Sequence, residues 1–166
     1  MKEIKRTSIP VYRTELVCES EIEWDDLISF TSPTDVAEFL YMRFLTNDVE
    51  EFVMLTMNAV GVATGFFSVS IGGLACSIVE IRAIFRRALL KNAYAIICAH
   101  NHPSGNPEPS AEDISITRQI AAVGALHSIP LRDHLIVCPG YGFTSMAERG
   151  YVKTKSATEI IRAITK

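Results

Sequence analysis

The chain has 166 residues, of which 48% are hydrophobic and 21% charged, so it can form one domain with its own core, and a disordered chain is excluded. The net charge of −3 provides no overall basic excess, which nucleic-acid-binding domains normally carry, although a local basic patch is compatible with it. The four cysteines are far apart and no signal peptide is evident, so we expect reduced thiols in a cytoplasmic protein.

The first part of the chain predicts an extension followed by a capped helix. We expect residues 1–30 to form an extension, with a strand over Pro10 to Val17, that packs on the domain. The main domain is expected over residues 31–151. Its first helix begins after Ser32, because Pro33 suits the first helical position and Asp35 completes a capping box. Residues 152–166 predict a C-terminal helix.

A run without charged residues extends from Phe52 to Val79 and is long enough to cross a bilayer. Glycines and polar side chains interrupt this run, so it predicts two buried strands joined by a turn near Asn58 to Gly61 rather than a membrane span. The remaining elements alternate: we expect helices over residues 78–92, over 110–126 and from 156 onward, and strands over residues 93–99 and 131–138. This order predicts a single α/β domain.

Two histidines follow the predicted strand over residues 93–99, in the stretch AHNHPSG. In an extended backbone, residues i and i+2 point to the same side, so His100 and His102 can face one point in space. Neutral imidazole is a favoured zinc ligand. The loop that follows offers three carboxylates as a third ligand, Glu108, Glu112 and Asp113.

Simpler interpretations of these residues stay open. A His-x-His pair is common without a metal, and Ser110 with Asp113 also has the spacing of a capping box, like two other pairs in this chain. The combined spacing, His-x-His-Pro-x6-Ser-x2-Asp, is far more specific than either part. It favours a metal site.

The stretch HNHPSGNPEPSAED resembles the zinc-binding signature of the JAMM metalloproteases, most closely that of the bacterial RadC-like branch. Segments such as EEFVMLTMN, FRRALLKNAYAIICAHNHPSG and LRDHLIVC match RadC-like segments in order, and the resemblance covers roughly residues 8–151. It implies the three-layer α+β JAB1/MPN fold, similar to that of cytidine deaminases, with a mixed β-sheet flanked by helices. Longer RadC proteins carry an N-terminal helix-hairpin-helix segment, and we expect this chain to be a short form without it.

The resemblance also implies roles for individual residues. His100, His102 and Asp113 would bind Zn²⁺ with water as the fourth ligand, and Ser110 would hydrogen-bond the developing oxyanion. A catalytic glutamate lies at the start of an early core strand in this family, and EEFVML aligns Glu51 with it. The neighbouring Glu50 is the other candidate, but it would point to the opposite face of the strand.

The implied activity is hydrolysis of an amide or isopeptide bond, in a peptide or protein-conjugate substrate, by a zinc-activated water. RadC-like chains usually have a Pro-Arg-Glu step before the helix near residue 80. This chain reads Val79-Glu80-Ile81-Arg82 there, which puts a local partner or substrate contact in doubt rather than the metal site.

Two other functions compete with this one. The first is a DNA-repair-associated accessory protein that binds DNA or a DNA-processing partner through the basic side chains of the predicted helix over 78–92; the net charge does not support it. The second is a non-catalytic interaction module. No membrane partner is expected, and self-association is left open.

Asp133 and His134 are neighbours on a predicted strand, so one of them could orient a zinc ligand, or both could be structural.

Overall fold

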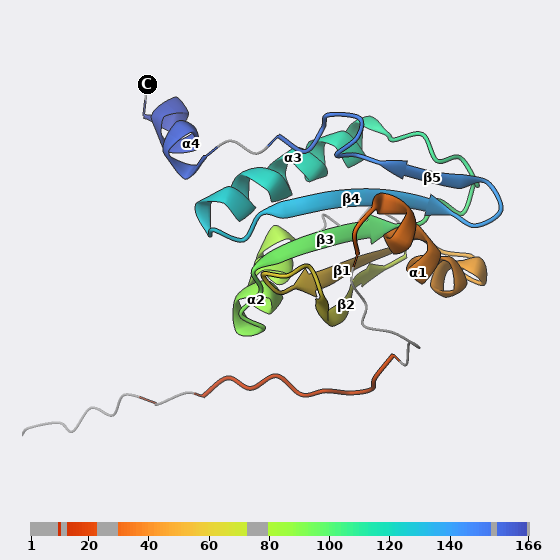
Figure 1. Ribbon diagram of the computed structural model, residues 1–166, viewed down its shortest axis with the longest axis horizontal. Helices are drawn as coiled ribbons and strands as arrows, with labels where there is room; N and C mark the ends of the chain where they lie inside the picture. The colour runs from red at the N-terminus through yellow and green to blue at the C-terminus, as the bar shows by residue number, and fades with distance from the viewer. Residues whose placement is uncertain (1–9, 11–12, 23–29, 73–79, 154–155, 166) are drawn as a thin grey trace, which may run out of the picture.

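The structure is a computed structural model that describes residue 10 and residues 13–22, 30–72, 80–153 and 156–165. Helices and strands alternate along the chain (Figure 1). In order they are α1 (Pro33–Leu45), β1 (Glu51–Met57), β2 (Ala63–Ile71), α2 (Ile81–Leu90), β3 (Ala95–His100), α3 (Ala111–Leu126), β4 (Leu131–Cys138), β5 (Gly142–Ser145) and α4 (Ala157–Ile164).

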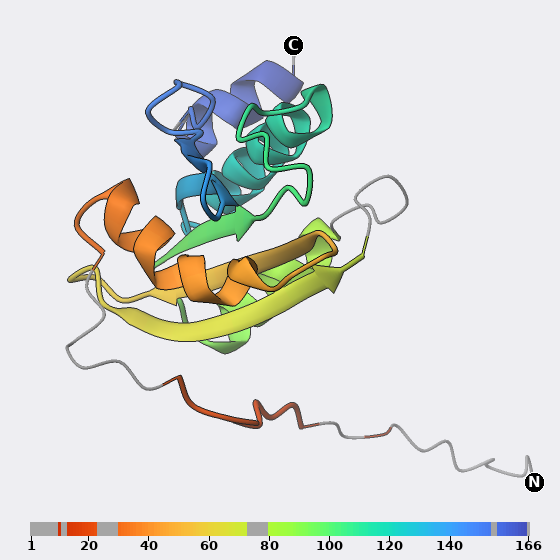
Figure 2. The ribbon, with the colours of Figure 1, turned by 90° about the vertical axis from the view of Figure 1, so that its right-hand side faces the viewer.

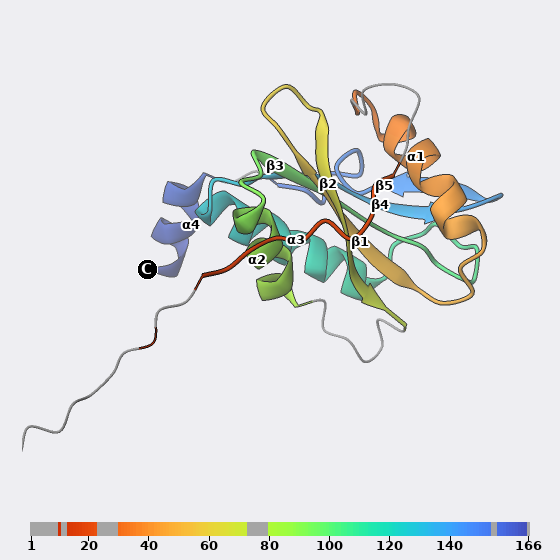
Figure 3. The same cartoon turned by 90° about the horizontal axis from the view of Figure 1, so that it is seen from below.

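The strands form one mixed sheet in the order β2-β1-β3-β4-β5. Strands β3 and β4 are parallel, because α3 returns the chain to the same end of the sheet between them, and the other neighbouring pairs are antiparallel. Helix α1 packs on one face of the sheet, and α2 and α3 pack on the other (Figures 2 and 3). The predicted mixed sheet flanked by helices in three layers is therefore confirmed.

Strand β1 shows why the central part of the sequence lacks charge. All of its residues are buried, with alternate side chains on opposite faces. Val53 and Leu55 pack in the core beneath α1, whereas Phe52 and Met54 pack in the core beneath α2 and α3. Both faces of a central strand are covered here, so a continuous apolar run replaces the polar alternation of a half-exposed strand.

The capping boxes inferred from the sequence are present at the starts of α1, α3 and α4. In each, a serine side chain accepts a hydrogen bond from the backbone of the residue three positions later, and that residue's carboxylate accepts one from the serine backbone. The box of α3, formed by Ser110 and Asp113, matters most because it fixes the position of a predicted metal ligand.

Two details of the prediction were wrong. Pro10 and residues 13–22 form no strand and are exposed, and Figure 1 shows this segment extending away from the sheet. Alternating apolar residues are insufficient for a strand, because each strand needs a neighbour for its backbone hydrogen bonds. The four-residue strand β5 was not predicted. The first residues of the helix predicted from residue 78 lie outside the described part of the chain.

Within the uncharged run, residues 52–57 lie in β1 and residues 63–71 form β2, with the predicted turn between them. Only β1 is buried as predicted, because β2 lies at the edge of the sheet and stays partly exposed. Among the described residues, none of the helices combines the length and apolar character needed to cross a bilayer. The three described cysteines, Cys18, Cys98 and Cys138, are free thiols.

Candidate metal centre

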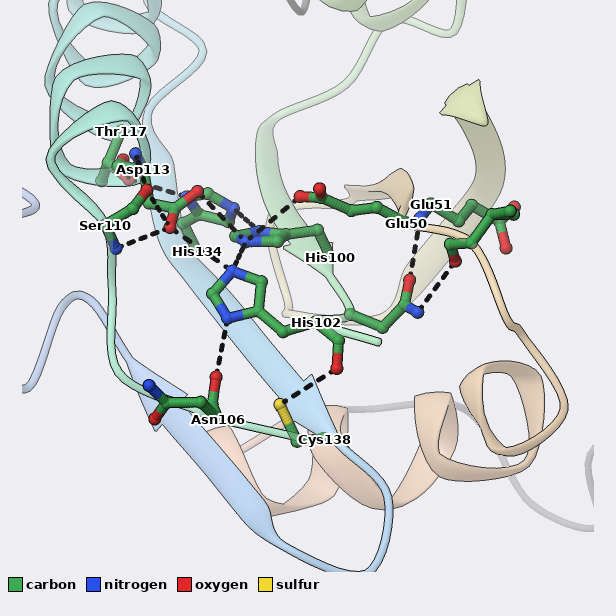
Figure 4. Close-up of polar contacts among 12 residues, drawn as sticks. Glu50, Glu51, His100, His102, Asn106, Ser110, Asp113, Thr117, His134 and Cys138 are labelled. Atoms are coloured by element: carbon green, nitrogen blue, oxygen red, sulfur yellow. Dashed lines mark hydrogen bonds and ion pairs between the residues drawn. The ribbon is translucent and has the colours of Figure 1, made fainter. Parts of the chain in front are cut away.

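Four side chains converge where β3 ends and α3 begins (Figure 4). His100 is the last residue of β3, His102 follows it in the loop, Asp113 lies in the first turn of α3, and Glu50 directly precedes β1. One ligand atom from each of the four lies within 4.8 Å of the others. The structure thus brings together the three residues predicted as zinc ligands.

Nitrogen and oxygen atoms face one another across this cluster at short range. His100 Nε2 lies 3.0 Å from His102 Nε2 and 3.2 Å from Asp113 Oδ1. His102 Nε2 lies 3.4 Å from Asp113 Oδ2. The fourth corner is Glu50, whose Oε1 is 3.8 Å from His100 Nε2. His100 and Asp113 are almost fully buried.

The register between β1 and β3 decides which glutamate reaches the cluster. Phe52 pairs with His100, and their rings stack with centroids 6.0 Å apart. Directly opposed side chains share one face of a sheet, so Glu50, two residues before Phe52, lies on the face of His100. Figure 4 shows the Glu50 carboxylate turned toward His100 and the Glu51 side chain turned away.

Glu51, the glutamate selected from the resemblance, lies on the other face of β1. Its carboxylate accepts hydrogen bonds from Arg43 Nη2 at 2.6 Å, from Arg43 Nε at 3.0 Å and from Asn47 Nδ2 at 2.8 Å. Burial alone would raise the pKa of Glu51, but the hydrogen bonds and the Arg43 charge outweigh burial and hold this pKa below its ordinary value. Glu51 is therefore placed in an ion pair with α1, outside the cluster.

Asn101, which the sequence analysis overlooked, connects the end of β3 with the segment that carries Glu50. Its Oδ1 accepts from the Glu51 backbone N–H at 2.8 Å, and its Nδ2 donates to the Val49 carbonyl at 3.0 Å. The backbone on both sides of Glu50 is thereby fixed to the residue between the two histidines. The only sequence signal was the position of Asn101 within HNH.

Asp113 is both a capping residue and a member of the cluster. Its Oδ2 accepts from the Ser110 backbone N–H at 2.8 Å and from the Ser110 hydroxyl at 2.6 Å, while Oδ1 faces His100. Burial would raise the pKa of Asp113, but the two imidazoles and Ser110 outweigh it and hold this pKa well below its usual range. The same carboxylate therefore caps α3 and belongs to the cluster that could hold a metal ion.

The other two candidate carboxylates lie elsewhere. Glu108 forms a two-pronged ion pair with Arg149, with both N–O distances at 2.6 Å, and Glu112 is exposed. The ion pair joins the loop between β3 and α3 to the turn after β5. The same loop turns at Gly105, whose φ of +76° favours glycine, and a Cβ at this position would come within 2.9 Å of the Tyr141 ring.

The donor set of the cluster fits a divalent metal ion. His102 Nδ1 lies 2.7 Å from the Asn106 carbonyl, which can only accept, so Nδ1 carries the proton and Nε2 offers a lone pair to the cluster. Hydrogen bonding to Asp113 raises the pKa of His102 despite partial burial. Two imidazoles and a carboxylate match the nitrogen and oxygen ligands of catalytic zinc sites, which keep one position open.

Asp133 and His134 have different roles because they lie on opposite faces of β4. The Asp133 carboxylate accepts from the backbone N–H groups of His134 and Ala147 at 2.7 and 2.8 Å, and from the Ser145 hydroxyl at 2.5 Å. It thus attaches β4 to the turn after β5. His134 faces the cluster, and its Nε2 lies 2.9 Å from His100 Nδ1. The Asp-His pair in the sequence left open which residue would reach a zinc ligand.

Comparison with known proteins agrees with this geometry. The family model described as RadC-like JAB domain matches residues 30–151. The chain is 47% identical over 134 residues to a UPF0758 protein of Salinibacter ruber, covering 81% of this chain and 57% of the relative. A UPF0758 protein of Geobacillus is 39% identical over 135 residues, covering 80% of this chain and 58% of the relative.

A third UPF0758 protein, of Halalkalibacterium halodurans, is 43% identical over 123 residues, covering 73% of this chain and 52% of the relative. The chain thus spans little more than half the length of these relatives, and their printed names state no activity. The matched residues include α1, all five strands and the whole cluster. The chain therefore belongs to the RadC-like JAB domain family.

Proposed function

We propose that the chain is a zinc-dependent hydrolase of the JAMM type, which cleaves an amide or isopeptide bond in a peptide or protein conjugate. The observation that carries this proposal is the cluster itself, in which two imidazoles and the Asp113 carboxylate meet a second carboxylate, Glu50, from another strand. A purely structural metal site is usually closed by four protein ligands, whereas a hydrolytic site also needs a base.

The position of each residue in the cluster indicates its proposed role in the reaction. His100, His102 and Asp113 would hold the metal ion. A zinc ion bound there supplies a water of lowered pKa and polarises the substrate carbonyl. Glu50 Oε1 would accept the proton of the attacking water and later deliver it to the leaving amine. This assigns to Glu50 the role that the resemblance gave to Glu51, whose carboxylate is engaged with Arg43.

Charge that develops on the substrate oxygen would lie near the start of α3. The N-terminus of a helix carries a partial positive charge, and Ser110 caps α3 beside the cluster. The Ser110 hydroxyl donates to Asp113 Oδ2. To stabilise an oxyanion it would have to redirect this hydrogen bond toward the substrate. We keep Ser110 as the proposed oxyanion donor, and losing one such donor costs roughly 100- to 1000-fold in kcat.

The sharpest test compares two neighbouring glutamates. Zinc-loaded wild type, Glu50→Gln and Glu51→Gln are assayed with panels of fluorogenic peptides and lysine isopeptides. We expect Glu50→Gln to keep its zinc but to lose about 10²- to 10⁴-fold in kcat, because general-base catalysis is removed. We expect Glu51→Gln to keep both zinc and kcat. Full activity in Glu50→Gln would remove Glu50 from the mechanism.

The DNA-associated role stays a prediction with its own test. Arg82 and Arg86 are exposed on α2 and Lys91 is exposed directly after it, while Arg87 donates to the Ala83 carbonyl. If these side chains contact phosphates, DNA binding must weaken steeply with salt and fall further in Arg82→Ala/Arg86→Ala. Unchanged binding in that variant would contradict the role. The substrates and partners of the longer relatives bear on this chain only as proposals.

A further inference from the structure

His134 is a fully buried histidine that does not belong to the four-residue cluster. It lies on β4 with its side chain 0% exposed, between the last residue of β3 and the second turn of α3. Its Nε2 lies 2.9 Å from His100 Nδ1, and its Nδ1 lies 2.7 Å from Thr117 Oγ1 (Figure 4). Each of its ring nitrogens therefore has one hydrogen-bond partner.

The direction of these hydrogen bonds follows from Thr117. Its hydroxyl lies 2.6 Å from the Asp113 carbonyl oxygen, which can only accept, so the single hydroxyl hydrogen points to Asp113. Thr117 Oγ1 must then accept from His134 Nδ1, which carries a proton. Two oxygen atoms at this distance without a hydrogen between them would repel each other, so the reverse direction is disfavoured.

The protonation of His134 fixes the next hydrogen bond. A buried imidazolium would need a carboxylate partner, and the hydrogen-bond partners of His134 are a hydroxyl and an imidazole. In the neutral ring with Nδ1 protonated, Nε2 is an acceptor, so it accepts from His100 Nδ1–H.

We infer that His134 is a positioning residue that, with Thr117, holds His100 in the tautomer protonated on Nδ1, so that the Nε2 lone pair points into the cluster. The chain of hydrogen bonds runs from His100 through His134 and Thr117 to the Asp113 backbone. It joins two cluster residues from different elements, β3 and α3, and orients both. The inference rests on the proposed metal site, but the tautomer exists whether or not the protein is a hydrolase.

The first test is the tautomer of His100 in metal-free, ¹⁵N-labelled protein, read from long-range ¹H–¹⁵N spectra. The chain has four histidines, so single substitutions assign the signals. The pH is set about two units above the ordinary histidine pKa of ~6.5, where an imidazolium signal is weak. We expect Nδ1–H on both His100 and His134. A wild-type His100 protonated on Nε2 would overturn the inference.

The second test removes the chain of hydrogen bonds at a residue that does not touch His100. Thr117→Val keeps the side-chain shape but leaves His134 Nδ1–H without its acceptor. His134 should then move its proton to Nε2 and donate to His100. His100 should in turn carry its proton on Nε2, which can donate to Asp113 Oδ1 at 3.2 Å. Thr117→Ser should restore the wild-type spectrum. An unchanged His100 tautomer in Thr117→Val would contradict the inference.

Zinc affinity, measured by competition with a chromophoric chelator, gives an independent readout without any substrate. His134→Leu should weaken zinc binding about 10- to 100-fold, which is typical when the partner of a metal-bound histidine is lost. His134→Gln can both accept from His100 and donate to Thr117, so it should bind zinc nearly as the wild type does. His127→Leu is the matched control, because His127 stacks on Phe85 at the end of α3, away from the cluster.

Failure of this inference and failure of the proposed hydrolase can be distinguished. An inactive protein with His100 protonated on Nδ1 and zinc affinity that depends on His134 would overturn only the hydrolase. An active zinc enzyme whose affinity is equal in wild type and His134→Leu would overturn only the positioning role. Folding of each variant is checked by its backbone amide spectrum.

Discussion

Both faces of the sheet bury charged side chains, but the partners that compensate these charges differ between the two faces. On the face beneath α1, Glu51 receives hydrogen bonds from Arg43 and Asn47, and Asp133 receives them from Ser145 and two backbone N–H groups. On the face beneath α3, the ion pairs of Asp113 within the described residues are both with imidazoles. A buried charge that is hydrogen-bonded by donors of the chain itself indicates a structural role. Several acceptor atoms gathered around one point indicate a binding site for a ligand.

The neighbouring residues Glu50 and Glu51 show this contrast most directly. The Glu50 carboxylate lies beside His100, whereas the carboxylate of the next residue, Glu51, is paired with the Arg43 guanidinium. Residue type and sequence position are almost the same, so the difference comes from the face of the sheet alone. Substitutions on the two faces should therefore separate metal binding from stability.

The largest effect is expected on zinc binding, and it is tested by comparing two aspartates that cap helices. Asp113→Ala should abolish stoichiometric zinc binding, because it removes a ligand as well as a cap. Asp35→Ala is the matched control: it removes the corresponding residue of the capping box at α1, which lies outside the cluster. We expect this variant to lose part of its helix stability and to retain one zinc per chain. Metal content by plasma mass spectrometry and thermal unfolding check both variants.

Retention of zinc by a folded Asp113→Ala protein would contradict the ligand assignment. Equal zinc loss in both variants would show that helix capping, rather than the carboxylate, controls metal binding.

An intermediate effect is expected from Glu51 and depends on pH. Glu51→Gln should lower the free energy of unfolding by about 1–2 kcal/mol at neutral pH, because charged hydrogen bonds are weakened while Arg43 stays partly solvated. The folded pKa of Glu51 is lowered, so its contribution is complete above the ordinary value of 4.5 and is lost as the pH falls through the folded pKa. Urea unfolding of metal-free wild type and Glu51→Gln should therefore converge in acid. A difference that grows in acid would contradict this account.

The smallest effect is expected from Asp133, whose contribution to stability should change with pH in the opposite direction to that of Glu51. Burial raises its pKa, and the hydrogen bonds from Ser145, Ala147 and His134 only partly offset burial. Its contribution to stability is therefore complete below the ordinary value of 3.8 and is lost as the pH rises through the higher folded pKa. Asp133→Asn should gain stability relative to the wild type as the pH rises. Parallel pH profiles for the two proteins would show that Asp133 does not titrate as its burial requires.

Local patterns were sufficient to predict most of the helices and strands and three members of the cluster. His100 and His102 share a side by the parity of extended backbone, and the cap at Ser110 places Asp113 in the first turn of α3. The choice between Glu50 and Glu51 required the pairing of Phe52 with His100, which is a long-range register. Thr117 and His134 could not be paired from the sequence, because they come from a helix and a strand that meet only through the crossover between β3 and β4.

The central claim is that the cluster beneath α3 binds one zinc ion through two imidazoles and the Asp113 carboxylate. Zinc-edge X-ray absorption of protein loaded with one equivalent of metal tests this claim most directly. We expect only nitrogen and oxygen ligands at about 2.0–2.2 Å, with the scattering signature of two imidazoles that falls to one in His102→Ala. A sulfur ligand at about 2.3 Å, or a spectrum unchanged in His102→Ala, would contradict the account.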